Sequence, residues 1–467
     1  FARRRHRAHT MKIQQIALSG AMAAQAALNT TSHNVANAMT PGFTRQGALF
    51  SAVGPTAAGA AGSGNGVRVP SLIRFSDGYK SHQLWSAASE LGRHETVQPY
   101  LKQIEQVMSG EGSSLNKGLD AFFGALNAAS VDPNSAPLRQ QIITEAEALA
   151  QRFNGLNQVL LNQRLSIGQQ RGASVTQINN LAEQIARLNG EITAAESINV
   201  NPSGLVDERD LRIDELSQLV GLSVVDQPDG SRSVSLKSGV PLVAGAVAGR
   251  MELVNQLDGS QAIEVAFAKE SFKVRTEGLA GQLGGLYEFE DGVLMPTVAS
   301  IASLAEELAT RVNGQLAAGF APDGSPGTDL FVFNGADGLL SVRPGVTGDE
   351  LAFSSDPLQA GNSDNLLAII GLQNQSVPIA GLGSVRMGDV YTQLLGGIGI
   401  RSQQSQASFD TAKTVRDQAQ QSWASTSSVN TDEEAINLVQ YQQMYTANMK
   451  VIQVAGELFD AVIGSLR

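Results

Sequence analysis

Hydrophobic residues near the C-terminal end of the chain recur with a seven-residue period, in alternating steps of three and four. This spacing places them on one stripe of an α-helix and is typical of a coiled-coil seam. A second apolar row beside the first makes the face wider than a two-stranded seam needs. The first row contains Leu438, Tyr445, Met449, Ile452, Gly456, Phe459, Ile463 and Leu466, and the second contains Met444, Ala447, Val451, Val454, Leu458 and Ala461.

The C-terminal helix is expected to begin at Thr431 and to need a partner. We predict that Thr431 caps the helix while Glu434 hydrogen-bonds back to the Thr431 amide, the arrangement called a capping box. Each large apolar side chain stabilises the protein by about 1.5–3 kcal/mol when it is fully buried. The apolar face of the helix is therefore more stable when packed against a partner than when exposed to water. The pattern leaves two interpretations open: a helix that packs on its own domain, or a seam that binds other chains.

A second helix with a face of small residues is predicted near the N-terminus. Ala and Gly dominate that face, so another helix can approach it closely. The pattern stops before Pro41, because proline cannot continue a helix and disfavours helical backbone in the residue before it. The two ends of the chain, 11–47 and 429–467, are therefore predicted to form one coiled-coil domain. Its N-terminal face contains Ile13, Ile16, Gly20, Ala23, Ala27 and Thr31.

The segment between the two ends is predicted to be mainly α-helical, with inserted β domains. Short β-branched runs with turns at Asp229-Gly230 and Asp258-Gly259 predict a β-rich outer domain over 222–288. The segment 331–383 is predicted to be a small irregular or β insertion. The remaining segments, 48–221, 289–330 and 384–428, are assigned to a bundle of long helices.

Helical periods in this bundle are expected over 77–108, 115–129, 138–197, 207–220, 295–318 and 385–425. The segment 138–197 is either one very long helix or a hairpin that bends at Gly168 or Gly172. A flexible loop is expected over 47–66, because this segment is rich in Gly, Ala and Ser.

Composition narrows the class of protein. The chain has 467 residues and a net charge of -11, which argues against nucleic acid or an anionic membrane as its main partner. It contains no cysteine, so it must rely on packing or assembly without disulfides. No apolar run approaches the length of a membrane span. The Arg-rich segment 1–10 is expected to be an extension or a non-native leader before Met11, with a targeting signal as the other interpretation.

The sequence offers no clear catalytic or metal-binding motif. The five histidines do not form a metal-binding pair, and we expect no cofactor, no metal and no enzymatic activity. A cluster of acidic residues is instead expected to be a solvated helix face, with Arg209 and Arg212 pairing along it. The cluster contains Asp207, Glu208, Asp210, Asp214 and Glu215.

Both ends of the chain resemble the bacterial flagellar rod, hook and hook-associated proteins. The segment 28–46 reads LNTTSHNVANAMTPGFTRQ, which is similar to the N-terminal signature of that family. The resemblance implies that Asn34 and Asn37 lie near the end of the terminal helix, followed by a turn and a strand. The segment near the C-terminus is similar to the closing signature of the family. The residues that carry this similarity are Asn430, Asp432, Glu433, Glu434, Ala435, Gln442, Gln443, Tyr445, Phe459 and Asp460.

Three inner stretches, 66–84, 207–221 and 318–324, resemble the hook-associated members of the family. That resemblance implies a secreted structural adaptor at the hook–filament junction, required for filament assembly on the extracellular flagellum. The implied partners are further copies of the chain in a helical or ring assembly, the hook protein, the second hook–filament junction protein, an export chaperone at the C-terminal helix and the flagellar type III export apparatus.

Two other functions stay open: another rod or hook protein, or a secreted enzyme or adhesin carried on a flagellar scaffold. A catalytic fold between 222 and 383 would distinguish the last of these. The residues expected to carry assembly are Ile13, Ile16, Gly20, Ala23, Ala27, Asn34 and Asn37, together with Leu438, Tyr445, Met449, Ile452, Phe459, Ile463 and Leu466.

Overall fold

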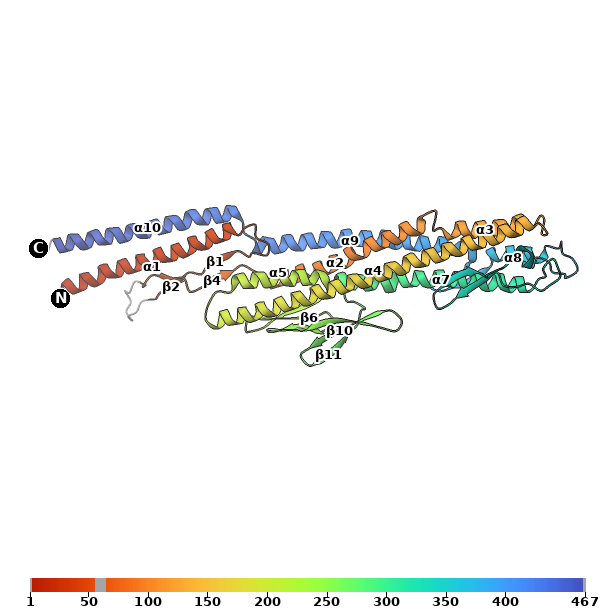
Figure 1. Ribbon diagram of the computed structural model, residues 1–467. Coiled ribbons are helices and arrows are strands. Elements are labelled where there is room, and N and C mark those ends of the chain that lie inside the picture. The colour runs from red at the N-terminus through yellow and green to blue at the C-terminus, as the bar shows by residue number, and fades with distance from the viewer. Residues whose placement is uncertain (1, 55–63, 465–467) are drawn as a thin grey trace.

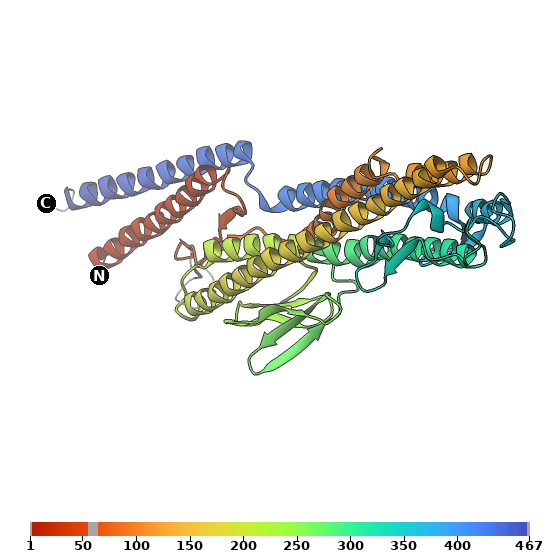
Figure 2. The same ribbon diagram turned by 45° about the vertical axis from the view of Figure 1, so that its right-hand side comes forward.

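The computed structural model of the chain describes residues 2–54 and 64–464. A hairpin of two terminal helices projects from one end of a long helical bundle, and the β domain lies on one side of the bundle (Figures 1 and 2). The hairpin consists of α1 (Ala2–Ala36) and α10 (Thr431–Gly464). Residues 2–10 of the expected leader continue α1 as helix.

Two short antiparallel ribbons follow α1. The first pairs β1 (Gln46–Ala48) with β4 (Leu72–Arg74), and the second pairs β2 (Ser51–Ala52) with β3 (Val67–Arg68). The predicted flexible loop therefore begins with paired strand, and β3 follows directly after it, while residues 55–63 lie outside the described part of the chain.

The bundle is built from long helices that run along the molecule (Figure 1). Its longest member, α4, is one uninterrupted helix of 62 residues, about 93 Å at 1.5 Å per residue. Gly168 and Gly172 do not break it, because Ile167, Arg171 and Val175 continue its buried face past both glycines. The long helices are α2 (Gly78–Ser109), α3 (Leu115–Ala129), α4 (Ala136–Ser197), α7 (Met295–Ala317) and α9 (Val390–Ser427).

The segment 331–383 completes the core of the bundle. Phe331 and Phe353 are buried in the same apolar cluster as Phe122 of α3 and Phe153 of α4. The predicted start of the last bundle helix was wrong, because residues 383–386 pair as a strand and α9 begins only at Val390. The elements here are β12 (Phe331–Asn334), β13 (Leu339–Val342), α8 (Asp364–Gly371), β14 (Ser376–Ile379) and β15 (Gly383–Arg386).

The β domain contains a four-stranded antiparallel sheet, in the order β5-β6-β7-β8, and a three-stranded one, in the order β11-β10-β9. Val234 and Val265 from the two sheets are buried in one cluster with Ile185 of α4 and Ile213 of α5 (Ser203–Leu219), so the sheets share their core with the helices. The strands are β5 (Leu222–Asp226), β6 (Arg232–Leu236), β7 (Pro241–Ala244), β8 (Val247–Ala248), β9 (Arg250–Asn255), β10 (Gln261–Phe267) and β11 (Glu270–Val274).

A helix inside the predicted β segment was missed. α6 (Gly281–Phe289) continues through a π-helical turn, η1 (Glu290–Leu294), into α7. The glycines of α6 make this helix hard to predict from the sequence, because glycine has a low helix propensity. They are needed here, because a Cβ at Gly285 would lie 2.6 Å from the Arg93 carbonyl oxygen of α2.

One described helix, 281–317, has the length and apolar composition of a membrane span. Half of its most apolar window is buried inside the protein. Leu286, Ile301 and Leu304 belong to the core of the bundle, so packing explains the apolar composition of this helix.

Candidate assembly interface and its anchor

The two terminal helices meet through the small-residue face of α1. Ala24 and Ala27 are fully buried in this face. Gly20 lies against Asn448 of α10, because a Cβ at Gly20 would come within 2.5 Å of the Asn448 Oδ1 atom. Small side chains thus allow the close approach that the sequence pattern predicted.

The predicted assembly residues occupy three environments. The buried ones all lie on α1: Gly20, Ala23, Ala27, Thr31 and Asn34. The half-buried ones are Ile16, Asn37 and, on α10, Tyr445, Ile452 and Phe459. Ile13, Leu438 and Met449 are exposed, at 45%, 37% and 43%. The side chain of Ile463 and the whole of Leu466 lie outside the described residues.

The second apolar row of α10 remains largely uncovered. Val451, Val454 and Leu458 are 45%, 45% and 54% exposed. They line a groove of about 360 Å³ with Ile13 of α1. The first row therefore contributes half-buried side chains to the contact with α1, and the second row presents apolar surface to solvent.

Substitution of Gly20 by valine is expected to loosen the hairpin. The new side chain meets Asn448, and overpacking of this kind costs about 1–3 kcal/mol. Amide hydrogen exchange in 12–36, measured by mass spectrometry, should become faster. Gln25→Val, at an exposed position of the same helix, should leave the exchange unchanged. Equal exchange in both variants would contradict the close packing.

The predicted cap of α10 was wrong. Asn430 is the capping residue, because its Oδ1 atom accepts hydrogen bonds from the amides of Asp432 (3.0 Å) and Glu433 (3.4 Å). Glu434 is buried and does not fold back on Thr431. It accepts a hydrogen bond from Arg45 Nε at 2.8 Å, and thereby ties α10 to the segment that follows α1.

Asn34 and Arg45 fix the base of the hairpin. The Asn34 side chain donates to the Gln46 carbonyl oxygen (2.8 Å) and accepts from the Gln46 amide (3.0 Å), as a strand partner would. The Arg45 amide donates to the Ser427 carbonyl oxygen at 2.8 Å. Asn34 and Asn37 do not adopt the left-handed conformation; Gly42, in the turn after the helix, does, with φ 77°.

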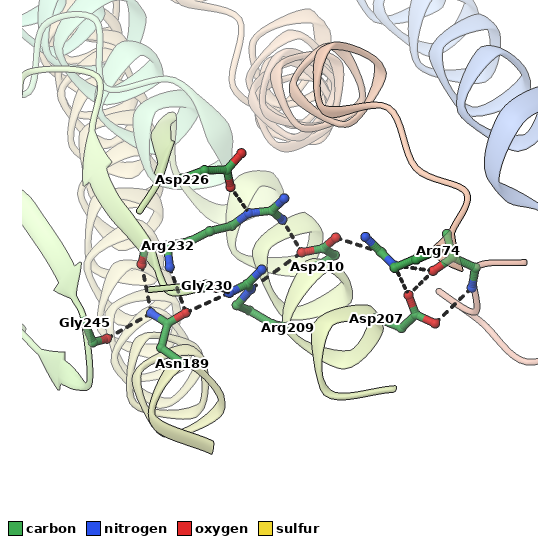
Figure 3. Close-up of polar contacts among 10 residues, drawn as sticks. Arg74, Asn189, Asp207, Arg209, Asp210, Asp226, Gly230, Arg232 and Gly245 are labelled. Atoms are coloured by element: carbon green, nitrogen blue, oxygen red, sulfur yellow. Dashed lines mark hydrogen bonds and ion pairs between the residues drawn. The ribbon is translucent and has the colours of Figure 1, made fainter. Parts of the chain in front are cut away.

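A buried ion-pair network anchors this base to the bundle (Figure 3). Arg74 of β4 reaches α5, where its Nε donates to Asp207 at 2.6 Å and its Nη2 donates to Asp210 at 2.9 Å. The Thr44 amide also donates to Asp207, at 3.0 Å. Arg232 of β6 pairs with Asp210 from the other side. The network therefore connects the terminal segment, α5 and the β domain.

A second branch of the network holds the β domain to α4. Arg209 donates to the Gly230 carbonyl oxygen (2.7 Å) and to Asn189 (3.2 Å). Asn189, fully buried on α4, donates in turn to the carbonyl oxygens of Arg232 and Gly245 (Figure 3). Each polar side chain thus bridges two elements.

Burial dominates the electrostatics of the network. It raises the pKa of Asp207 even though Arg74 favours the ionised form. It likewise raises the pKa of Asp214, which accepts a hydrogen bond from Arg416 of α9 at 2.7 Å. Burial and the nearby Arg232 lower the pKa of Arg209 to about 10. The cost of burying the charges thus offsets much of their attraction, so the intact network mainly fixes orientation, whereas removal of one partner is costly because the other group stays buried without it.

The prediction of a solvated acidic face was wrong for part of the cluster. Asp207, Asp210 and Asp214 recur at steps of three and four, which places them on one side of α5, where Asp207 is buried and Asp210 and Asp214 are half-buried. The spacing was visible in the sequence, but the arginines that meet them come from distant segments. The prediction holds for Arg212, which pairs with Glu208 and Glu215 along the partly exposed side.

Three family models match the chain. The helical-domain model of the flagellar hook-associated protein FlgK matches 101–331. The flagella basal body rod protein model matches 15–44, and the C-terminal model of the flagellar basal body rod FlgEFG proteins matches 420–464. The two rod models therefore coincide with parts of the terminal helices, and the first model coincides with most of the bundle and the β domain.

Curated relatives match almost the full length. The flagellar hook-associated protein 1 of Salmonella typhimurium is 29% identical over 96% of this chain and 98% of the relative. That of Bacillus subtilis is 26% identical over 95% and 96%. A solved structure, the flagellar hook junction protein FlgK from Burkholderia pseudomallei, covers 73% of this chain and 99% of its own, with 18% identity and a TM-score of 0.63. This last likeness shows the shared fold.

Proposed function

Since it is homologous over most of its length to flagellar hook-associated protein 1, the chain is a flagellar hook-associated structural protein, and we propose that it joins the hook to the filament. In this role it assembles through its terminal helices, and filament growth requires it. The observation that supports the proposal most is the projecting hairpin, which leaves apolar side chains of α1 and α10 in water.

The exposed apolar side chains of α1 and α10 support a role of these helices in assembly. Leu18 and Met22 of α1 are 52% and 63% exposed, so α1 also presents apolar side chains to water. Exposed apolar surface of this kind marks interaction sites in soluble proteins. We infer that other axial subunits cover it: further copies of this chain, the hook protein, and the second hook–filament junction protein.

The same apolar surface needs to be covered before assembly to prevent aggregation. An exposed apolar helix promotes aggregation, so an export chaperone that binds α10 until the chain leaves the cell fits its exposed row. Export through the flagellar type III apparatus and a place on the extracellular flagellum complete the proposal.

The other candidate functions have less support. A rod or hook protein would share the terminal matches at 15–44 and 420–464, but the FlgK helical-domain match favours the hook-associated branch. An enzyme or adhesin on this scaffold would carry a catalytic fold between 222 and 383. That segment forms small antiparallel sheets and the end of the bundle core, which favours the adaptor.

Binding to hooks tests the proposal. Purified chain is expected to sediment with hooks isolated from a strain that lacks the corresponding gene, because the exposed faces of α1 and α10 become buried on assembly. The chain alone, at the same concentration, should stay in the supernatant. A chain that remains soluble in the presence of hooks would contradict the proposed adaptor role.

A further inference from the structure

The exposed methionines of the chain gather on the terminal hairpin. The chain contains no cysteine and nine methionines, so thioethers are its sulfur groups that peroxide can oxidise. Among the described side chains, the exposed methionines are Met22 at 63%, Met39 at 95%, Met444 at 37% and Met449 at 43%. Three of them lie on α1 and α10, and Met39 lies in the turn after α1. The side chain of Met11 lies outside the described residues.

Packing protects the methionines of the bundle and the β domain. Met108 of α2 and Met387 before α9 are fully buried in the core of the bundle. Met251 of β9 is buried in the core that the β domain shares with α4 and α5, and Met295 of α7 is half-buried. Close packing leaves few voids larger than a water molecule, so a buried thioether is out of reach of peroxide. Oxidation of the folded chain should therefore begin on the terminal hairpin.

Three of the exposed methionines belong to the apolar surface of the hairpin. Met449 is part of the first row of α10, and Met444 is part of the second. Met22 lies one helical turn beyond Leu18, which is 52% exposed on α1. Met39 differs from them, because it lies after the end of α1 and outside both helices. A change of polarity at the first three therefore alters the surface through which the chain is proposed to assemble.

Hydrogen peroxide converts a methionine thioether into a sulfoxide. The sulfur atom attacks one peroxide oxygen, so that an S–O bond forms and the O–O bond breaks. The hydroxide that leaves takes the proton of the transferred hydroxyl group and becomes water. The sulfur loses two electrons, and the peroxide gains them. The product carries a polar oxygen in place of an apolar thioether, and burial of such an oxygen without a hydrogen-bond donor is unfavourable.

We propose that Met22, Met444 and Met449 are oxidation sites that control assembly: peroxide converts them to sulfoxides in the unassembled chain, and the oxidised hairpin no longer joins the axial structure. This inference rests on the proposed function, because the sulfoxides act only where the faces of the hairpin become buried. Assembly in turn covers the three side chains and protects them from peroxide. Methionine sulfoxide reductases return the sulfoxide to the thioether, so the modification is reversible.

Peptide mass spectrometry of the peroxide-treated chain tests the selectivity of the oxidation. The four exposed methionines are expected to gain one oxygen atom each well before the three buried ones. Circular dichroism of the treated chain should equal that of the untreated chain. Treatment after assembly on isolated hooks should spare Met22, Met444 and Met449. Equal oxidation of exposed and buried methionines, a loss of helical signal, or equal oxidation of these three in the free and the assembled chain would overturn the proposal.

Sedimentation with isolated hooks tests the consequence of the oxidation. The treated parent chain should bind hooks at least about tenfold more weakly than the untreated parent chain. A variant that combines Met22→Leu, Met444→Leu and Met449→Leu keeps apolar side chains of similar volume and lacks the three thioethers. It should bind hooks equally well before and after treatment. Incubation of the treated parent chain with methionine sulfoxide reductases A and B, which act on the two sulfoxide epimers, should restore its binding.

Met39→Leu is the matched control. It removes the most exposed described thioether and leaves both helices unchanged, so it should lose hook binding on treatment as the parent chain does. Met11 is kept in every variant. Equal binding by the treated and untreated parent chains, protection by Met39→Leu alone, or loss of binding by the treated triple variant would overturn the proposal and leave the adaptor function standing. Failure of the untreated parent chain to bind hooks would overturn both.

Discussion

A chain carrying Val454→Asp or Leu458→Asp is expected to fold like the parent chain and to lose binding to hooks. Both side chains are about half exposed in the isolated chain, so a charge there is hydrated. On assembly it would be buried without a partner, which costs about 3–5 kcal/mol on the scale of a broken buried ion pair. Sedimentation with isolated hooks should therefore weaken at least a hundredfold.

The control for this prediction lies on the same helix. Thr446→Asp adds the same charge at an exposed position that belongs to neither apolar row. It should bind hooks like the parent chain. Circular dichroism and thermal unfolding should be equal for all these variants. Normal binding by Val454→Asp would remove the second row from the assembly, and global unfolding would show that this row supports the isolated chain.

Asp207→Ala is expected to cause the largest loss of stability among single changes in the anchor. It leaves the Thr44 amide without its acceptor and removes one carboxylate from the partly buried Arg74. Removal of one partner from a buried network costs about 3–5 kcal/mol. Urea unfolding followed by tryptophan fluorescence measures this loss of stability. Trp85 reports on the network, because the Arg232 guanidinium carbon lies over the Trp85 ring, 5.4 Å from its centroid.

Two comparisons separate charge from hydrogen bonding. Asp207→Asn keeps one acceptor oxygen, and burial already disfavours the charge at this position, so its cost should be well below that of alanine. Glu208→Ala changes the adjacent residue, whose side chain is 44% exposed, and should change stability by less than about 0.5 kcal/mol. Equal losses in Asp207→Asn and Asp207→Ala would show that the charge, and not the hydrogen bonds, anchors the terminal segment.

Local periodicity predicted the helices because it reports one face of one element. The segment 115–129 is a helix with the predicted bounds, and 77–108 differs from α2 by one residue at each end. Periodicity could not show which face of α10 meets α1, because that face includes Asn448, a polar residue outside both apolar rows. That choice depends on the fit between Gly20 and Asn448, which come from opposite ends of the chain.

Contacts between distant segments explain the predictions that were wrong. Glu434 has the spacing of a capping box with Thr431, but Arg45 binds it and Asn430 caps the helix. Asp207 and Asp210 were predicted to be solvated, because the arginines that pair with them, Arg74 and Arg232, are far from them in sequence. The glycines of α6 suggest a turn until its close packing on α2 is known.

Electron microscopy of flagella from a deletion strain tests the central claim most directly. Cells that lack this chain are expected to carry hooks without filaments, and expression of the parent chain should restore filaments on the same hooks. Filaments of normal length and number on the hooks of the deletion strain would contradict the account.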